Sequence, residues 1–534
     1  MILLKLMLNT KKILNIFKKK SGIFASFDNK NLIVAILLAL TVLLGAWARL
    51  HDLGKKTLVA DEFLDMNSSF AYHETGIWQA WDFNLNAVDT RDVYAPRDER
   101  AWIYKWQVAK VFDFLIPTEE VARSVSVFWG LVSIILTYFL TVSYTGSRRI
   151  GLLVAFLIAI SPMAITFSRK LRMYAMFYPV YMILSWLLFK FYEKRYKGKK
   201  MLLKFFDSKI GVNMQFGLPL AIVAALSLHL HLLTLNIALV FFFYVLVQAI
   251  LNFRKEKAIF NNKYAIHLSL MVFLVAIAAA VSPKFIGAFN GSFKFFMDNT
   301  EYFTMIMRDY SSAFWVVFFG ISGFVYLYFF ENKKKESVWL AVSLLVPLFL
   351  AAFTWRRVQG SQYIFFVHSF LVTLISSGIY ATALFFKKNL NFHPKRFFAV
   401  CILLSLLLLP DYSYFSNKES EYVASESDNY REGFKFVRKK LVEGDVIITR
   451  NFRNYYLSGA NVKVYDFGGE RAERKVSVEE LTRIMETDRH GWVIFFDNDR
   501  LFFNKEARDY VENNLKKVED KKLKGDMEIY TWGK

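Results

Sequence analysis

The sequence predicts a mostly α-helical, polytopic membrane protein with about eleven transmembrane helices and a small C-terminal α/β domain. First, 55% of the 534 residues are hydrophobic and 55 are Phe, above the apolar share of about 45–50% that is typical of soluble domains. Second, Lys and Arg gather in short clusters between apolar runs, as they do in membrane loops. Third, the residues after 411 are charged and lack long apolar runs.

Eleven apolar runs are candidates for membrane spans. A helix needs about 17–25 apolar residues to cross the hydrocarbon core, where it satisfies its own backbone hydrogen bonds. The third, fifth and last runs are short. The expected spans are 31–50, 123–144, 150–167, 173–191, 212–229, 232–252, 265–283, 313–330, 337–354, 363–385 and 397–411. Residues 31–411 therefore form the transmembrane domain, between a basic N-terminal segment, 1–30, and a separate domain, 412–534.

Basic clusters predict the orientation of these spans. With residues 1–30 in the cytoplasm, six clusters fall on the cytoplasmic side, as the positive-inside rule requires. They are 18–20, 148–149, 190–204, 254–257, 333–335 and 387–396. The long loop 51–122 and the C-terminal domain are then extracytoplasmic.

The formal charge of +22 is explained by this topology and predicts contact with membrane lipids, not with nucleic acid. The single Cys excludes disulfides within the chain and thiolate metal sites.

Two regions outside the spans show regular patterns. Residues 101–116 (AWIYKWQVAKVFDFLI) read as an amphipathic helix in the membrane interface, or as an ordinary helix packed within the loop. In the C-terminal domain, β-type runs alternate with helical patterns, which is typical of a small α/β domain. The runs are 445–450, 462–467, 492–498 and 527–532, and the helical patterns are 430–442, 476–488 and 505–518.

Two basic clusters break the positive-inside rule. Arg169, Lys170 and Arg172 lie in a short turn expected outside, and Arg356 and Arg357 lie in another. An anionic group at the outer surface would compensate for them, and Arg suits bidentate phosphate binding. Alternatively, these arginines and the lysine pair with the acidic external loop or with lipid headgroups.

Acidic and histidine side chains are expected on the same side. Asp61 and Glu62 follow the first span in an apolar frame, and His229 and His231 lie in a tight external turn. The histidines could bind substrate or a metal, or simply cap the turn.

A carboxylate and arginines at an outer surface fit sugar transfer from a polyprenyl-phosphate donor, because one base accepts the proton of the acceptor hydroxyl and cations stabilise the departing phosphate. Phosphate leaves as a stable anion, so the second carboxylate of glycoside hydrolysis is not needed.

The chain resembles the GT-C superfamily of integral-membrane glycosyltransferases, in the branch of protein O-mannosyltransferases and lipid A aminoarabinose transferases. The resemblance covers about residues 30–385. It rests on VADEF after the first span, VARSVSVFWGLVSIILTYFL, the fairly specific segment SPMAITFSRKLRMYAM, and a histidine before an apolar run followed by a late arginine turn leading into QYIFFVHSFLVTL.

The resemblance implies inverting transfer from a polyprenyl-phosphate-linked sugar to a lipid, glycan or protein acceptor on the outer face of the membrane. Carried over, Asp61 would be the catalytic carboxylate with Glu62 beside it. The donor would contact Arg169, Arg172 and Tyr174, and its phosphate would contact Arg356 or Arg357.

One departure from the family concerns the first external loop. Where relatives have a proline-rich segment, this chain reads YAPRDERAWIYKW, so Asp98 or Glu99 could add a second acidic site for the acceptor. The sequence requires no cofactor, and a divalent metal is compatible with the superfamily.

Two other functions fit parts of the sequence. A transporter or flippase of lipid-linked saccharides would also be polytopic, but transporters usually carry ionisable groups at mid-membrane and related halves. The predicted spans are nearly free of such charges and show no paired halves. A scaffold would instead depend on residues 412–534 and not on Asp61.

Overall fold

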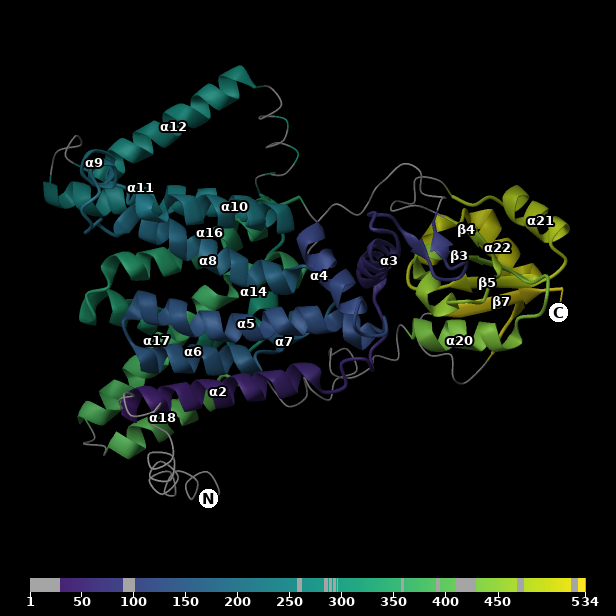
Figure 1. The fold of residues 1–534 in the computed structure, drawn as a ribbon, viewed down its shortest axis with the longest axis horizontal. Coiled ribbons are helices and arrows are strands. Elements are labelled where there is room, and N and C mark those ends of the chain that lie inside the picture. Colours follow the sequence, from purple (N-terminus) through teal and green to yellow (C-terminus); the bar gives the residue numbers. More distant parts are fainter. Residues whose placement is uncertain are drawn as a thin grey trace.

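The structure is a computed structural model that describes residues 29–89, 101–256, 262–282, 287, 291, 294, 296–356, 360–389, 394–409, 429–467, 475–519 and 527–533. These residues form a helical bundle with a smaller domain at one end, hereafter the domain end (Figure 1). Eight helices in this part of the chain are long and apolar enough to cross a membrane. The protein is therefore a multi-pass membrane protein, as its sequence predicts.

The eight spanning helices account for most of the bundle. They are α2 (Asn29–Leu50), α5 (Glu119–Thr145), α8 (Tyr174–Glu193), η3 (Leu232–Leu235) with α11 (Asn236–Glu256), α12 (Lys263–Val281), α15 (Ala313–Val325) with η5 (Tyr326–Phe330), α16 (Lys334–Thr354), and η7 (Phe365–Val367) with α17 (His368–Asn389). The short segments α14 (Glu301–Met307) and η6 (Ser361–Tyr363) lie between spans.

Two further candidate spans are bent. α6 (Arg148–Ile160) and α7 (Pro162–Ser168) meet at 61°, and Met201–Ile210 (α9 with η1) meets Met214–Leu230 (η2 with α10) at 113°. Pro162 explains the first bend, because proline lacks an N–H and disfavours the helical conformation of the preceding residue. If each pair is one span, the described residues contain up to ten. The eleventh expected span falls on α18 (Pro394–Leu406), whose 13 residues are too short to cross a bilayer alone.

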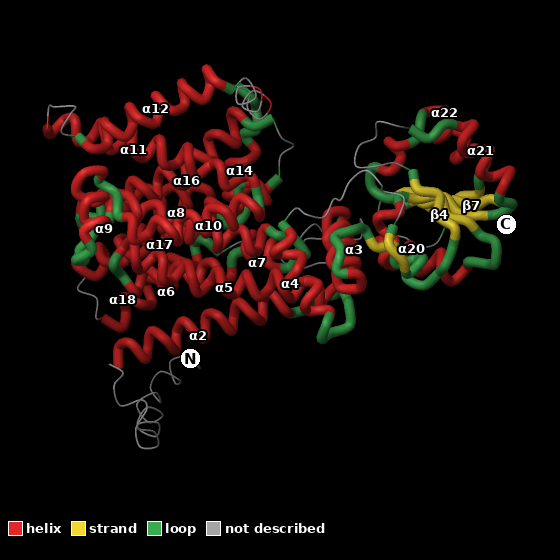
Figure 2. Tube along the Cα trace, turned by 45° about the horizontal axis from the view of Figure 1, so that its top comes forward, coloured by secondary structure: helices red, strands yellow, loops and turns green. Residues whose placement is uncertain are grey.

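The smaller domain contains a five-stranded sheet of order β4-β3-β5-β7-β6 (Figure 2). β3 pairs in parallel with β4 and β5, and β7 pairs antiparallel with β5 and β6. The strands are β3 (Val446–Thr449), β4 (Lys463–Asp466), β5 (Gly491–Phe495), β6 (Lys516–Lys517) and β7 (Glu528–Trp532). The small C-terminal α/β fold expected from the sequence is thus present.

Helices cover both faces of this sheet. Successive strand residues point to opposite faces, so Ile447 packs with Phe434 of α20 (Tyr430–Lys440) on one face. Its neighbour Ile448 joins the cluster of α21 (Val478–Thr487) and α22 (Lys505–Asn514) on the other. Short helical turns follow two of the strands, η8 (Asn451–Leu457) after β3 and η9 (Asp499–Phe502) after β5.

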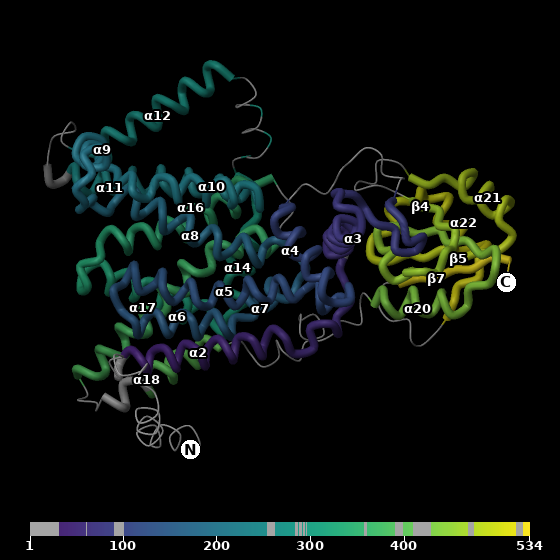
Figure 3. Tube along the Cα trace, in the orientation of Figure 1, coloured from purple at the N-terminus to yellow at the C-terminus, as the bar shows by residue number. Residues whose placement is uncertain are grey.

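α3 (Ala60–Thr75) lies between the bundle and the C-terminal domain (Figures 1 and 3). Phe63 packs its ring against Tyr430, Phe452 and Tyr456, with ring centroids 5.5–5.9 Å apart. Asn67 also donates a 3.0 Å hydrogen bond to the carbonyl of Phe452. A short hairpin of β1 (Trp81–Asp82) and β2 (Ala87–Val88) follows α3. One face of α3 is thereby fixed to the C-terminal domain.

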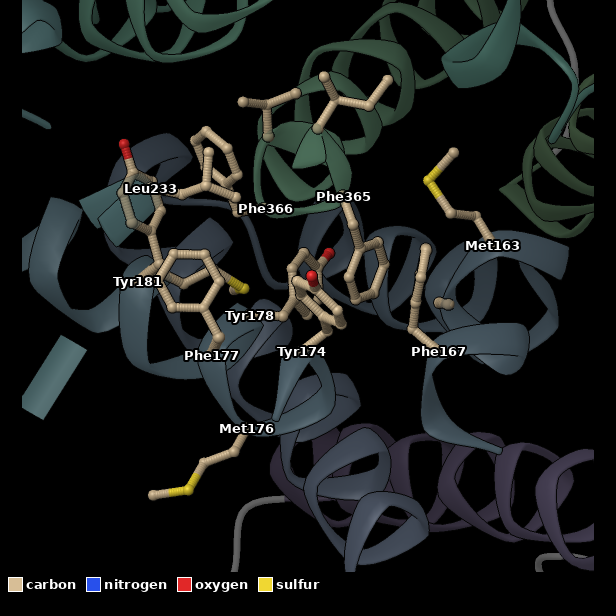
Figure 4. Packing of buried hydrophobic residues seen from close by; sticks show 14 of the residues in the cluster. Met163, Phe167, Tyr174, Met176, Phe177, Tyr178, Tyr181, Leu233, Phe365 and Phe366 are labelled. Carbon is tan, nitrogen blue, oxygen red and sulfur yellow. The ribbon is translucent and has the colours of Figure 1, made fainter. Parts of the chain in front are cut away.

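An aromatic cluster lies where α7, α8 and η7 meet (Figure 4). The ring of Tyr178 stacks on Phe365 at 4.3 Å between centroids, and Phe167 packs against the same ring at 4.6 Å. Buried aromatic side chains contribute large apolar areas and specific ring geometry. This cluster fixes the start of α8, where Tyr174 lies, relative to α7.

Candidate active site

Asp61 and Glu62 are adjacent in the first turn of α3 but occupy different environments. The side chain of Asp61 is 61% exposed, whereas that of Glu62 is 1% exposed. Glu62 accepts a 3.0 Å hydrogen bond from the N–H of Val59, the residue before the helix. Carboxylates in a first helical turn are stabilised by the helix dipole. Only Asp61 is open to a substrate.

Glu62 is held by a buried bidentate pair with Arg123 of α5. Nε of Arg123 donates to Oε1 at 2.9 Å and Nη2 donates to Oε2 at 2.7 Å. The N–H of Leu171 also donates to Oε1, at 2.6 Å. Burial raises the pKa of Glu62, but Arg123 and the backbone donors outweigh this effect and hold the pKa below its ordinary value. With both oxygens occupied, Glu62 positions α3 and the turn that follows α7.

The remaining donors of Arg123 bind the turn between α2 and α3. Nη1 donates to the carbonyls of Leu53 and Lys56 at 3.0 and 2.7 Å, and Nη2 donates to Thr57 at 2.9 Å. All five N–H groups of a guanidinium are therefore engaged. A single buried arginine connects α5, the 53–57 turn and α3.

Arg172 lies beside the open carboxylate. Its Nη2 is 3.3 Å from Oδ2 of Asp61, and its Nη1 donates to Oδ2 of Asp65 at 3.0 Å. Asp65 is one helical turn after Asp61, so both carboxylates lie on the same face of α3. Burial lowers the pKa of Arg172, but Asp65 and Asp61 outweigh it and the pKa is raised. Within the described residues, Nε of Arg172 is buried and makes no hydrogen bond.

Burial also raises the pKa of Asp65, although Arg172 and Lys105 oppose this effect. Lys105 is itself buried in α4 (Trp102–Phe112), and its Nζ lies 5.5 Å from the ring centre of Trp78. The other face of α4 exposes Trp102 and Trp106. The 101–116 segment is therefore helical over 102–112, with one face packed in the protein. Lys105 adds a second cation close to Arg172 and Asp65.

Tyr174 and His231 extend this group along α8 and η3. The guanidinium of Arg172 is 5.9 Å from the ring centre of Tyr174, and the ring of His231 is 5.5 Å from that of Tyr174. Nδ1 of His231 accepts a 3.0 Å hydrogen bond from the N–H of Leu233, which places the proton of a neutral ring on Nε2. Tyr363 packs on His231 at 6.3 Å. The structure thus brings Asp61, Arg172, Tyr174 and His231 together.

His229 lies against α4. Its ring packs edge-on against Trp102 with centroids 5.5 Å apart. Nε2 of His229 is buried and makes no hydrogen bond to the part of the chain that the structure describes. In the same part of the chain, no three His, Cys, Asp or Glu side chains form a group that could hold a metal.

Arg169 has a different environment from Arg172. It is 7% exposed, and its Nη1 donates to the carbonyls of Arg49 and His51 at 2.9 and 2.6 Å. Its Nη2 donates to the carbonyl of Asp52 at 3.1 Å. These carbonyls lie at and just beyond the end of α2, where a cation is stabilised by the helix dipole. The predicted contact of Arg169 with the sugar donor thus competes with the hydrogen bonds that hold the end of α2.

Four other predicted residues are not placed beside Asp61 by the structure. Arg357, Asp98 and Glu99 lie outside the described residues. Arg356 follows α16 and is exposed. It makes no ion pair or hydrogen bond with Asp61 in the described structure.

Sequence reasoning missed two further buried arrangements. Arg49 donates to the carbonyls of Ala159 and Ile158 at the end of α6, at 2.9 and 3.1 Å. Asp309 receives hydrogen bonds from Ser161 and the N–H of Met163 and lies 3.1 Å from Nε2 of His368. Both arrangements fix the bend between α6 and α7. A charged residue at the edge of an apolar run was the available signal for Arg49 and Arg123.

No family model and no curated protein matches the sequence. Solved structures do match. This chain is similar to ArnT from Cupriavidus metallidurans bound to undecaprenyl phosphate, with a TM-score of 0.55 and 11% identity. The match covers 93% of this chain and 97% of the ArnT chain. This chain has the GT-C fold.

An oligosaccharyltransferase supports the same assignment. AglB from Archaeoglobus fulgidus, in complex with an inhibitory peptide and a dolichol-phosphate, matches 87% of this chain and 69% of its own length, with a TM-score of 0.55 and 11% identity. The apo form of the oligosaccharyltransferase from that organism gives a TM-score of 0.57, covers 86% and 69%, and is 11% identical. The resemblance that the sequence predicted is confirmed for the GT-C fold.

Proposed function

We propose that this protein transfers a sugar from a polyprenyl-phosphate-linked donor to an acceptor at the domain end of the bundle, on the outer face of the membrane. The observation that carries the proposal is the pairing of an exposed carboxylate, Asp61, with a largely buried guanidinium, Arg172, at 3.3 Å. A base and a phosphate-binding cation are thereby adjacent, with the base open to an acceptor.

The chemistry requires one base and one cationic site. The oxygen of the acceptor hydroxyl attacks the anomeric carbon while Asp61 accepts the hydroxyl proton. The bond between that carbon and the phosphate oxygen breaks, and polyprenyl phosphate leaves with the electron pair. A single displacement of this kind inverts the anomeric carbon. Arg172 stabilises the charge on the departing phosphate, with Lys105 close by.

The neighbouring side chains support this division of roles. Arg172 is held by Asp65, 3.0 Å from Nη1, so it is oriented before a donor arrives. Glu62 is fully used in holding Arg123 and Leu171, so it positions Asp61 and does not accept the proton. His231 and Tyr174 lie on the side of Arg172 where α8 and η3 meet, where they are placed to contact the sugar.

The lipid part of the donor would lie along the spanning helices. The similar structures support a polyprenyl donor, because ArnT was solved with undecaprenyl phosphate and AglB with a dolichol-phosphate. AglB was also solved with a peptide. The acceptor of this chain is a lipid, glycan or protein.

The test compares Asp61→Asn with Glu74→Gln, a carboxylate change at the far end of α3, in membranes supplied with a labelled polyprenyl-phosphate sugar. Loss of a general base lowers a rate by about 10²–10⁴-fold, so transfer should fall by that factor in Asp61→Asn and stay unchanged in Glu74→Gln. Both variants should be produced in equal amounts. Transfer by Asp61→Asn at the wild-type rate would remove Asp61 from the mechanism. Donor that crosses vesicles without being cleaved would identify a flippase.

A further inference from the structure

A groove of about 740 Å³ opens between the C-terminal domain and the segments that connect it to the bundle. On the connecting side it is lined by Phe70 of α3, Phe83 and Asn86 of the hairpin and residues 116–118, and on the domain side by Tyr455, Tyr456, Ser458 and four cations of α20. Phe63, Asn67 and Phe70 share one face of α3, whereas Asp61 and Asp65 lie on the opposite face. The groove is therefore separated from the candidate active site by α3.

One wall of the groove is strongly basic. The four cations, Arg431, Lys435, Arg438 and Lys439, recur at the i, i+4, i+7 and i+8 positions of one helical face. The adjoining face of α20 buries Phe434 and Val437 in the core beside the sheet.

Nearby carboxylates neutralise only part of this charge. Arg431 pairs with Glu119, and Lys435 lies 3.3 Å from Glu432 in an exposed contact. An exposed pair of this kind contributes little. Arg438 donates a 3.5 Å hydrogen bond to the carbonyl of Tyr456, which leaves its charge without a carboxylate partner in the described structure. The described residues that line the groove include no Asp or Glu.

At Ile116 the groove meets an exposed apolar segment, 114–116, hereafter the rim. Phe114, Leu115 and Ile116 are 84%, 54% and 79% exposed, and Ile116 also lines the groove. These residues immediately precede α5, which begins at Glu119 and is a candidate span of 27 residues. They therefore lie where the chain enters the bilayer. Exposed apolar residues beside basic ones are typical of a protein surface in contact with anionic lipid.

We infer that this groove binds an anionic lipid from the leaflet on the domain side. Its phosphate-bearing headgroup lies among Lys435, Arg438 and Lys439, and its acyl chain packs against the 114–116 rim. An acidic peptide or a soluble anion would use the basic wall but not an exposed apolar rim beside a membrane span. The bound lipid bridges α20 and the start of α5, so it ties the C-terminal domain to the membrane surface. This inference does not depend on the proposed glycosyl transfer.

The experiment uses the delipidated full-length protein in detergent, with bound lipid counted by native mass spectrometry as phosphatidylglycerol or phosphatidylcholine is added. Lys435→Glu/Lys439→Glu is compared with Lys475→Glu/Lys505→Glu, which makes the same charge change on exposed lysines of the C-terminal domain that do not line the groove. Each cation near an anionic lipid contributes about 1 kcal/mol, or about fivefold in affinity. We expect phosphatidylglycerol to bind at least about 20-fold more weakly to the first variant and normally to the second.

Two further arms test the lipid assignment. Ile116→Ser should weaken phosphatidylglycerol binding without a change of charge, because it removes an apolar contact from the rim. Glycerol 3-phosphate, which carries the headgroup charge without chains, should not displace the lipid. Equal binding by both double variants, equal binding of phosphatidylcholine, no effect of Ile116→Ser, or displacement by glycerol 3-phosphate would each overturn the inference. Thermal unfolding of each variant shows whether it remains folded.

Discussion

Replacing Arg123 by Met should destabilise the protein more than any other single change near the candidate site. The variant loses five hydrogen bonds, at 2.7–3.0 Å, and leaves the carboxylate of Glu62 buried without its cation. Removing one partner of a buried ion pair costs about 3–5 kcal/mol. Burial then acts on Glu62 without opposition, so its pKa should rise. Leu171 and Arg172 would also lose the anchor that sets their position relative to α3.

The assay is thermal unfolding of purified protein in detergent, with Arg148→Met as the matched control. Arg148 is an exposed residue at the start of α6, where a substitution changes stability by about 0.5 kcal/mol or less. Arg123→Lys should be intermediate, because lysine keeps the charge but has three donors and cannot form the planar bidentate contact. Equal unfolding temperatures for Arg123→Met and Arg148→Met would refute the structural role of the Arg123–Glu62 pair.

Three other outcomes follow from the same contacts. Asp65→Asn should raise the KM for the donor in steady-state kinetics, because Arg172 loses the carboxylate 3.0 Å from Nη1; an unchanged KM would show that Arg172 is oriented by other groups. Arg169→Met should lower the unfolding temperature and Arg172→Met should instead lower sugar transfer, so the reverse pattern would exchange their assignments. The folded-state pKa of Glu62 lies below its ordinary 4.5, so wild type should exceed Glu62→Gln in stability above about pH 4.5. This advantage should disappear as the pH falls through the folded-state pKa, and an advantage independent of pH would contradict the ionic role of Glu62.

The sequence predicted the elements of the fold well because their signals are local. Long apolar runs and alternating charge specify spanning helices, and the expected β-type runs at 445–450 and 492–498 became β3 and β5. The expected eleventh span, 397–411, falls on α18, which has 13 residues in the described structure. Its run already ended near Pro410, and proline interrupts helical hydrogen bonding.

The side-chain arrangement of the site was predictable only in part, because it depends on contacts between distant segments. Asp61 and Arg172 were singled out by their unusual surroundings, and the structure brings them together. Their adjacency in the sequence does not show which of Asp61 and Glu62 is the candidate base, since Glu62 is set apart mainly by its contacts with the distant residues Arg123 and Leu171. Asp65 had a usable signal, its i+4 spacing from Asp61 on a helix.

Two arginines that break the positive-inside rule are therefore stabilised in different ways in this protein. Arg169 satisfies its charge with backbone carbonyls at the end of α2, so those bonds would have to be broken before it could bind an anion. Arg172 is balanced by side-chain carboxylates, one of which is exposed, and it keeps a buried Nε without a hydrogen bond in the described structure. Arg172 is therefore the cation of this turn that contacts the phosphate in the proposed mechanism. The proposal thus depends less on the number of cations in the turn than on whether each cation is held by backbone carbonyls or by side-chain carboxylates.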